Sequence, residues 1–164
     1  MQSKRLTLSR AILWVCAIAV AIAIFSFSAQ DGPESSAVSN AVAEIIIDVI
    51  DPDYEALADT DRVSIFAFVK KLVRKGAHFC EFAALGFFIR MLTGSYGLRH
   101  PTRWAWLAGA LYACTDELHQ LFVASRACMW QDVLLDSCGV LAGVTVAYAV
   151  RVLWSRYRPA RQDG

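Results

Sequence analysis

Long runs of apolar residues alternate with more polar segments along this 164-residue chain. The apolar runs lie at about 11–27, 76–92, 104–123 and 133–153. A transmembrane helix needs about 17 to 25 mainly apolar residues, so each run is long enough to cross a bilayer. The pattern therefore predicts an all-α fold, an integral membrane four-helix bundle that forms a single domain over residues 1–164.

The segment between the first two runs, residues 28–75, is polar overall, but parts of it have helical periodicity. Within 37–50 the apolar residues share one side of the expected helix. The polar stripe of this helix recurs at every fourth position: Asn40, Glu44 and Asp48. Residues 62–75 read as a second amphipathic segment. We therefore expect one or two amphipathic helices that lie on the membrane surface or over the bundle, with a solvated linker as the alternative.

The composition agrees with a membrane protein and excludes several other classes. Hydrophobic residues make up 57% of the chain, which is high for a soluble domain. The net charge of +1 argues against a nucleic-acid-binding protein, which normally carries a basic surface. The five cysteines are odd in number and form no CxxC pair, so a disulfide framework or a zinc ribbon is not expected.

The basic residues predict how the chain crosses the membrane. They gather at the N-terminus, near the 94–103 turn and in the tail: Lys4, Arg5, Arg10, Arg90, Arg99, Arg103, Arg151, Arg156, Arg158 and Arg161. Short segments rich in lysine and arginine stay in the cytoplasm. This rule places both termini inside and residues 28–75 outside a multi-pass protein of the cell membrane. The first apolar run also resembles a signal peptide, but its length favours a retained helix.

Ionisable and amide side chains interrupt the apolar runs, and they define the candidate site. The candidate residues are Gln30, Lys75, His78, Glu81, Asp116, Glu117, His119, Gln120, Arg126, Asp132 and Asp136. With both termini inside, these residues all fall in the outer half of the predicted bundle. Ionisable groups at membrane depth are costly and usually face a protein interior or a wet cavity. Asp116, His119 and Gln120 also share one helix face, because they are three and four residues apart.

Several of these residues stand in recognisable motifs. The motifs are RKGAHFCEFAALG at 74–86, TDELHQLFVASR at 115–126, QDVLLDSCGVLAG at 131–143 and FSAQDG at 27–32. Together they resemble the VanZ-like family, which is named for a protein associated with teicoplanin resistance. A glycine or proline often precedes the loop arginine in that family, where this chain has Ala124 and Ser125, and asparagine often replaces Asp136. The resemblance implies a small bacterial membrane protein with a link to glycopeptide antibiotics, and it implies no particular reaction.

Two interpretations of the polar residues need no catalysis. In the first, the residues form a structural network, with Arg74 or Lys75 paired to Asp116 or Glu117 and Arg126 paired to Asp132. In the second, they line an outward-facing pocket for a glycopeptide-type antibiotic or an envelope component. Lys75 and Arg126 would then contact anionic groups, while His119 and Gln120 would donate or accept hydrogen bonds.

A third interpretation is a membrane-embedded hydrolase or transferase, so whether the protein is an enzyme stays open. The candidate catalytic residues are Glu117, His119, His78 and Glu81, as acid–base groups or as ligands of a divalent metal. We expect no bound metal and no other cofactor, because Lys75 and Arg126 would repel a cation and compete for the carboxylates. The expected partners are the lipid bilayer and the antibiotic or envelope precursor, and no nucleic acid.

Overall fold

The computed structural model describes residues 2–29, 32–123 and 129–157, and these residues form five α-helices and one short 3-10 helix. The elements are α1 (Gln2–Ser28), α2 (Gly32–Ile50), η1 (Tyr54–Ala56), α3 (Asp59–Ser95), α4 (Pro101–Gln120) and α5 (Trp130–Tyr157). The described part of the chain contains no strand, so the predicted all-α fold class is confirmed.

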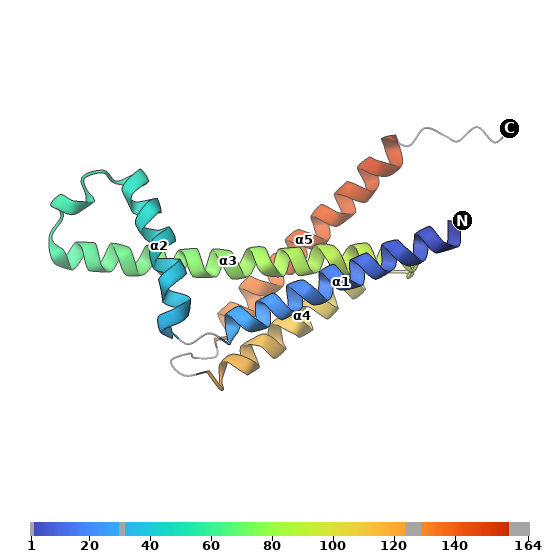
Figure 1. Cartoon of the computed structure of the whole chain (residues 1–164), viewed down its shortest axis with the longest axis horizontal. Helices are drawn as coiled ribbons and strands as arrows, with labels where there is room; N and C mark the ends of the chain where they lie inside the picture. Colours follow the sequence, from blue (N-terminus) through green and yellow to red (C-terminus); the bar gives the residue numbers. More distant parts are fainter. Residues whose placement is uncertain (1, 30–31, 124–128, 158–164) are drawn as a thin grey trace.

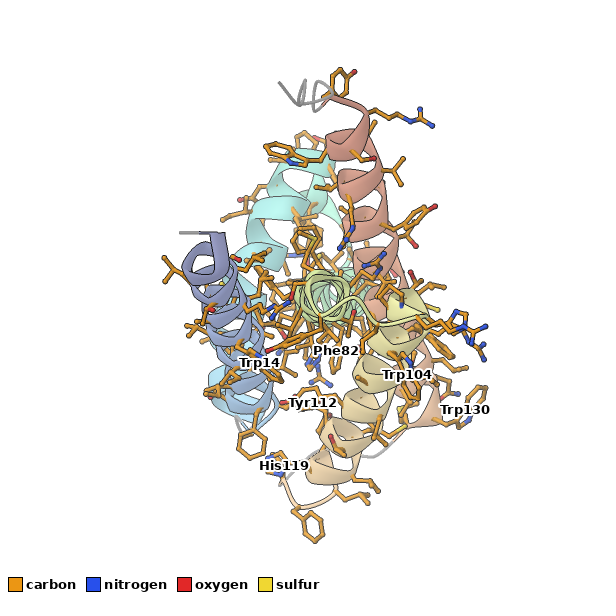
Figure 2. All side chains as sticks on the ribbon, turned by 90° about the vertical axis from the view of Figure 1, so that its right-hand side faces the viewer. Trp14, Phe82, Trp104, Tyr112, His119 and Trp130 are labelled. Carbon is orange, nitrogen blue, oxygen red and sulfur yellow. The ribbon has the colours of Figure 1, made fainter. Side chains whose placement is uncertain are left out.

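Helix α3 is the centre of the molecule. In Figure 2 it is seen end-on in the middle, with α1 on one side of it and α4 and α5 on the other. Figure 1 shows that α1 and α4 lie along the C-terminal part of α3 and that α5 crosses α3 obliquely, while the N-terminal part of α3 extends beyond them. Helix α2 crosses this extension and packs against it. The amphipathic helix predicted at 37–50 is therefore present, and it lies across α3.

The predicted division between an amphipathic helix at 62–75 and a span at 76–92 is wrong. Residues Asp59–Ser95 form one continuous helix of 37 residues. Gly76 stands at the expected boundary, but a glycine inside a helix costs only about 1 kcal/mol relative to alanine. No neighbouring atom lies within 4 Å of the position that a side chain on Gly76 would occupy. Nothing at this position therefore ends the helix.

Glycines let α3 and α5 approach each other closely. A Cβ atom added to Gly139 would lie 2.5 Å from the carbonyl oxygen of Phe79, and one added to Gly143 would overlap the carbonyl oxygen of Ala83. From the other helix, a Cβ atom on Gly86 would overlap the carbonyl oxygen of Val140. Small residues at helix contacts are typical of membrane bundles, where close backbone packing replaces the hydrophobic effect. Gly139 and Gly143 thus mark the close contact between α3 and α5.

Among the described residues, two helices are long and apolar enough to cross a membrane: Leu6–Ser28 and Trp130–Tyr157. They contain the predicted spans 11–27 and 133–153. The other predicted spans, 76–92 and 104–123, lie in helices that do not meet this criterion. Their charged and polar side chains lower their hydropathy, and α4 ends at Gln120, where a turn follows, rather than at residue 123.

The end of the bundle where α1 begins and α5 ends (Figure 1) is held by arginine contacts with neutral groups. Arg10 donates from Nη2 to the carbonyl oxygen of Ser95 at 2.8 Å, and its guanidinium lies 4.5 Å from the centre of the Tyr96 ring. The side chain of Arg90, only 4% exposed, donates from Nε to Thr102 Oγ1 at 3.0 Å. These contacts link α1 to α3 and its C-terminal turn, and α3 to α4. We call this region the basic end.

Candidate functional site

At the opposite end of the bundle, Asp116 on α4 joins two helices by hydrogen bonds. Its carboxylate is 3% exposed, and its Oδ2 atom accepts a hydrogen bond from Ser28 Oγ at 2.8 Å. The same oxygen accepts from Gln120 Nε2 at 3.1 Å. The bond to Gln120 confirms that these two residues share a helix face, and the bond to Ser28 attaches the end of α1 to α4. We call this region the acidic end.

An imidazole and two carboxylates from three helices meet at the acidic end. His78 on α3, Asp116 on α4 and Asp136 on α5 each offer a nitrogen or oxygen atom, and these atoms lie within 4.8 Å of one another. Asp136 is also 3% exposed. Its Oδ1 atom and that of Asp116 have no hydrogen-bond partner among the described residues. Buried carboxylate oxygens normally have such partners, so this convergence requires a chemical explanation.

Lys75 pairs with Asp132 by an ion pair and hydrogen bond. The predicted pairing of Lys75 with Asp116 or Glu117 is therefore not found. Both members of the observed pair keep about a quarter of their side-chain surface exposed, 30% for Lys75 and 23% for Asp132. A pair near the surface loses less hydration than a pair with a fully buried carboxylate, which accounts for the choice of Asp132.

Glu117 holds the start of α5 against α4. Its side chain is 1% exposed, and Oε1 accepts a hydrogen bond of 2.6 Å from the backbone N–H of Met129, the residue before α5. The second oxygen, Oε2, has no hydrogen-bond partner in the described part of the chain. The Oε1 atom of Glu117 therefore has a structural role, because it accepts a hydrogen bond from a backbone N–H group at the start of a helix, as a capping residue does.

His119, which the sequence grouped with His78 and Glu81 as a candidate catalytic residue or metal ligand, is not part of the cluster formed by His78, Asp116 and Asp136. Its ring stacks on Phe25 of α1, with the ring centres 4.3 Å apart. Figure 2 shows His119 near the outer edge of the bundle, away from α3. Residues two apart on a helix do not face each other, so Glu117 and His119 point in different directions. Asp136, rather than His119, lies beside His78.

A small cavity of about 20 Å³ opens beside these groups. It is lined by Arg74, Lys75, His78, Gln120, Asp132, Leu135 and Asp136. A cavity needs about 10 to 15 Å³ to hold one water molecule, so this one accommodates about one water-sized group. Two of its lining side chains are cationic, which suits the oxygen of an anionic group.

The remaining candidate residues differ in how far the structure places them. Glu81 on α3 is half-buried, and its Oε2 atom has no hydrogen-bond partner among the described residues. Gln30 and Arg126 lie outside the described residues. Ser28 was not among the candidate residues, although it is fully buried and bound to Asp116. The signal in the sequence was a serine at the very end of an otherwise apolar run.

The described residues thus define a helical bundle whose buried acidic groups converge at the end opposite the basic one. The chain belongs to the VanZ/LLP1 family, whose model matches residues 13–153 and so covers most of the sequence. This membership confirms the resemblance seen in the motifs, and it links the chain to resistance at the level of the family. Comparisons with curated proteins and with solved structures gave no match.

Proposed function

We propose that this chain is a four-span protein of the cell membrane, with both termini in the cytoplasm and the acidic end facing outward. The proposal is supported by the apolar side chains on the outer surfaces of the helices. Exposed examples on α1, α4 and α5 are Leu8, Ile12, Val15, Ile18, Ile22, Leu107, Leu111, Leu118, Leu134, Leu141, Val146, Val150 and Leu153. Large exposed apolar surfaces mark contact with a membrane or a partner. The basic end then faces the cytoplasm, in agreement with the positive-inside rule.

The acidic end, in this proposal, binds a polar envelope component or a glycopeptide-type antibiotic and thereby contributes to resistance. The observation that carries the proposal is the convergence of polar side chains from α1, α3, α4 and α5 in one layer. Drug-sized ligands usually occupy pockets of about 300 to 1,000 Å³, whereas this cavity measures about 20 Å³. Only a small group fits inside it. Arg74 and Lys75 on its wall favour an anionic group, such as one on an envelope lipid.

Antibiotic sensitivity tests this function directly. The protein is expressed in a susceptible host, and the minimum inhibitory concentration of teicoplanin is compared with that of an empty-vector strain. We expect the wild type to raise this concentration and Glu117→Gln to abolish the increase, because the buried carboxylate holds the site together. Glu44→Gln is the matched control, since Glu44 is exposed on α2. Equal protein levels are verified by immunoblotting, and an unchanged sensitivity with the wild type contradicts the resistance function.

A second candidate function is a membrane-embedded hydrolase or transferase that acts on a phosphate-bearing envelope lipid. It is favoured by the imidazole of His78, which lies beside two buried carboxylates, since this combination suits acid–base chemistry. Release of inorganic phosphate from a lipid phosphate ester by purified protein tests this function. His78→Gln should abolish the release, whereas His100→Gln, in the exposed turn before α4, should not. Absence of release by the wild type would contradict the enzymatic function and leave the binding function standing.

A further inference from the structure

The convergence of His78, Asp116 and Asp136 raises the question of what holds these groups together. One oxygen of each buried carboxyl group and one imidazole nitrogen lie within 4.8 Å of one another. Burying an unpaired carboxylate is expensive, because the interior replaces none of the hydration that it loses. Ser28 and Gln120 donate neutral hydrogen bonds to one oxygen of Asp116, and neither supplies a positive charge.

Lys75 does not pair with Asp116 or with Asp136. Lys75 pairs with Asp132 at the more exposed mouth of the cavity. The sequence led us to expect no metal because Lys75 would compete for these carboxylates, and the structure removes this part of the argument. One oxygen each of Asp116 and Asp136 has no hydrogen-bond partner among the described residues.

We propose that His78, Asp116 and Asp136 bind one divalent transition-metal ion, such as Zn²⁺ or Mn²⁺. Imidazole and carboxylate groups are the ligands that these ions use in proteins. Zinc lies about 2.0 to 2.2 Å from such donors, so two donors of one ion are at most about 4.4 Å apart. The observed limit of 4.8 Å therefore requires only a small rotation of the side chains. The ion would also neutralise the two aspartates.

The three protein ligands would not complete the coordination of the ion. Three protein ligands leave at least one coordination position for water or substrate, as in catalytic zinc sites. The cavity beside His78 and Asp136 holds about one water-sized group, which is the space that such a position needs. Glu81 is one turn from His78 on α3, and its unpartnered Oε2 atom is available as a further ligand or as an acceptor for a metal-bound water.

Titration of the full-length protein with metal ions tests this site. The protein is purified in detergent, stripped with a chelator, and titrated with Zn²⁺ or Mn²⁺ in a calorimeter, with elemental analysis of the dialysed product. We expect one ion per chain for the wild type. Asp136→Asn should weaken binding by more than about 100-fold, because even groups that only orient metal ligands contribute about 10- to 100-fold.

Two further variants separate loss of the site from loss of the fold. Asp132→Asn is the matched control, since it removes a carboxylate of the same cavity that already pairs with Lys75, and it should keep one ion per chain. His78→Gln should lose the ion as Asp136→Asn does. The ion should raise the unfolding temperature of the wild type and of Asp132→Asn, and leave that of the other two variants unchanged.

Failure of the wild type to bind any ion would overturn the proposal, as would equal loss in Asp132→Asn and Asp136→Asn. Retention of the ion by Asp136→Asn would also overturn it. The titration requires no antibiotic or lipid substrate, and the sensitivity assay requires no metal measurement. The outcome for the metal site can therefore be distinguished from the outcome for the proposed function.

Discussion

The two ends of the bundle both bury charged side chains, but they arrange them differently. At the basic end, Arg10 donates to a backbone carbonyl and Arg90 donates to a hydroxyl, each across a different pair of elements. At the acidic end, His78, Asp116 and Asp136 turn toward a single point. Separate contacts between neighbouring elements are sufficient to hold helices together. Convergence on one point creates a place for a ligand, and this difference is what distinguishes a site from a set of buried charges.

The largest expected effect comes from the close contact between α3 and α5, which lies between the basic end and the acidic end. Gly143→Ala should lower the free energy of unfolding by about 3 kcal/mol, the upper end of the usual cost of overpacking, because the new methyl group overlaps the carbonyl oxygen of Ala83. Backbone atoms in a helix cannot move aside as a side chain can. Chemical denaturation in detergent measures the change. Gly76→Ala is the control. It should raise the stability by up to about 1 kcal/mol, because alanine is the better helix former and no atom lies within 4 Å of its added Cβ atom. An equal loss in both variants would contradict the role of the contact between α3 and α5.

A substitution at Arg90 should affect the basic end alone. Arg90→Met removes the bond to Thr102 and should cost about 2 kcal/mol, within the range for hydrogen bonds that involve a charged group. The same denaturation experiment measures it. Arg99→Met, in the exposed turn, should be within about 0.5 kcal/mol of the wild type. Antibiotic sensitivity should remain unchanged in Arg90→Met at equal protein levels. A change there would show that the two ends are coupled.

The corresponding substitution at the acidic end is Ser28→Ala. It removes the hydroxyl that donates to Asp116 Oδ2 and should cost about 1.5 kcal/mol. Ser26→Ala provides the control, because the hydroxyl of Ser26 is exposed and bonds to Ile22 within its own helix. Thermal unfolding of the two variants compares them directly. Similar stabilities would mean that the bond between α1 and α4 contributes little.

The smallest expected effect concerns the ion pair at the mouth of the cavity. Both side chains are partly exposed, so the coupling energy between Lys75 and Asp132 should be about 0.5 kcal/mol. A double-mutant cycle with Lys75→Met and Asp132→Asn measures it. The coupling should fall further at high salt. A coupling of several kcal/mol would contradict this expectation. It would show that the pair behaves as a buried interaction, like those of the cluster around Asp116.

The convergence at the acidic end followed from the sequence because consecutive antiparallel helices alternate in direction. Asp116 lies near the end of one helix and Asp136 near the start of the next, so their levels could be matched without knowing the fold. The side of each helix that packs against its neighbours could not be predicted. Helices α1 and α5 have apolar residues on all sides, so their periodicity does not tell which side meets α3.

For the same reason, some of the predicted partners of individual side chains were wrong. Lys75 was expected to reach Asp116 or Glu117, and His119 was grouped with His78 as a candidate catalytic residue or metal ligand. These pairings depend on the rotation of each helix about its own axis. That rotation is set by contacts such as the approach of Gly143 to Ala83, which no local pattern in the sequence specifies. The Asp116–Gln120 bond, by contrast, lies within one turn and was predictable.

The unbroken course of α3 has a structural consequence. At about 1.5 Å per residue its 37 residues measure roughly 55 Å, well beyond the about 30 Å of a hydrocarbon layer. Near the N-terminal end of α3, Arg62 pairs with Glu55 of η1 at 2.6 Å. The helix that carries His78 therefore also carries the contacts with α2 and η1.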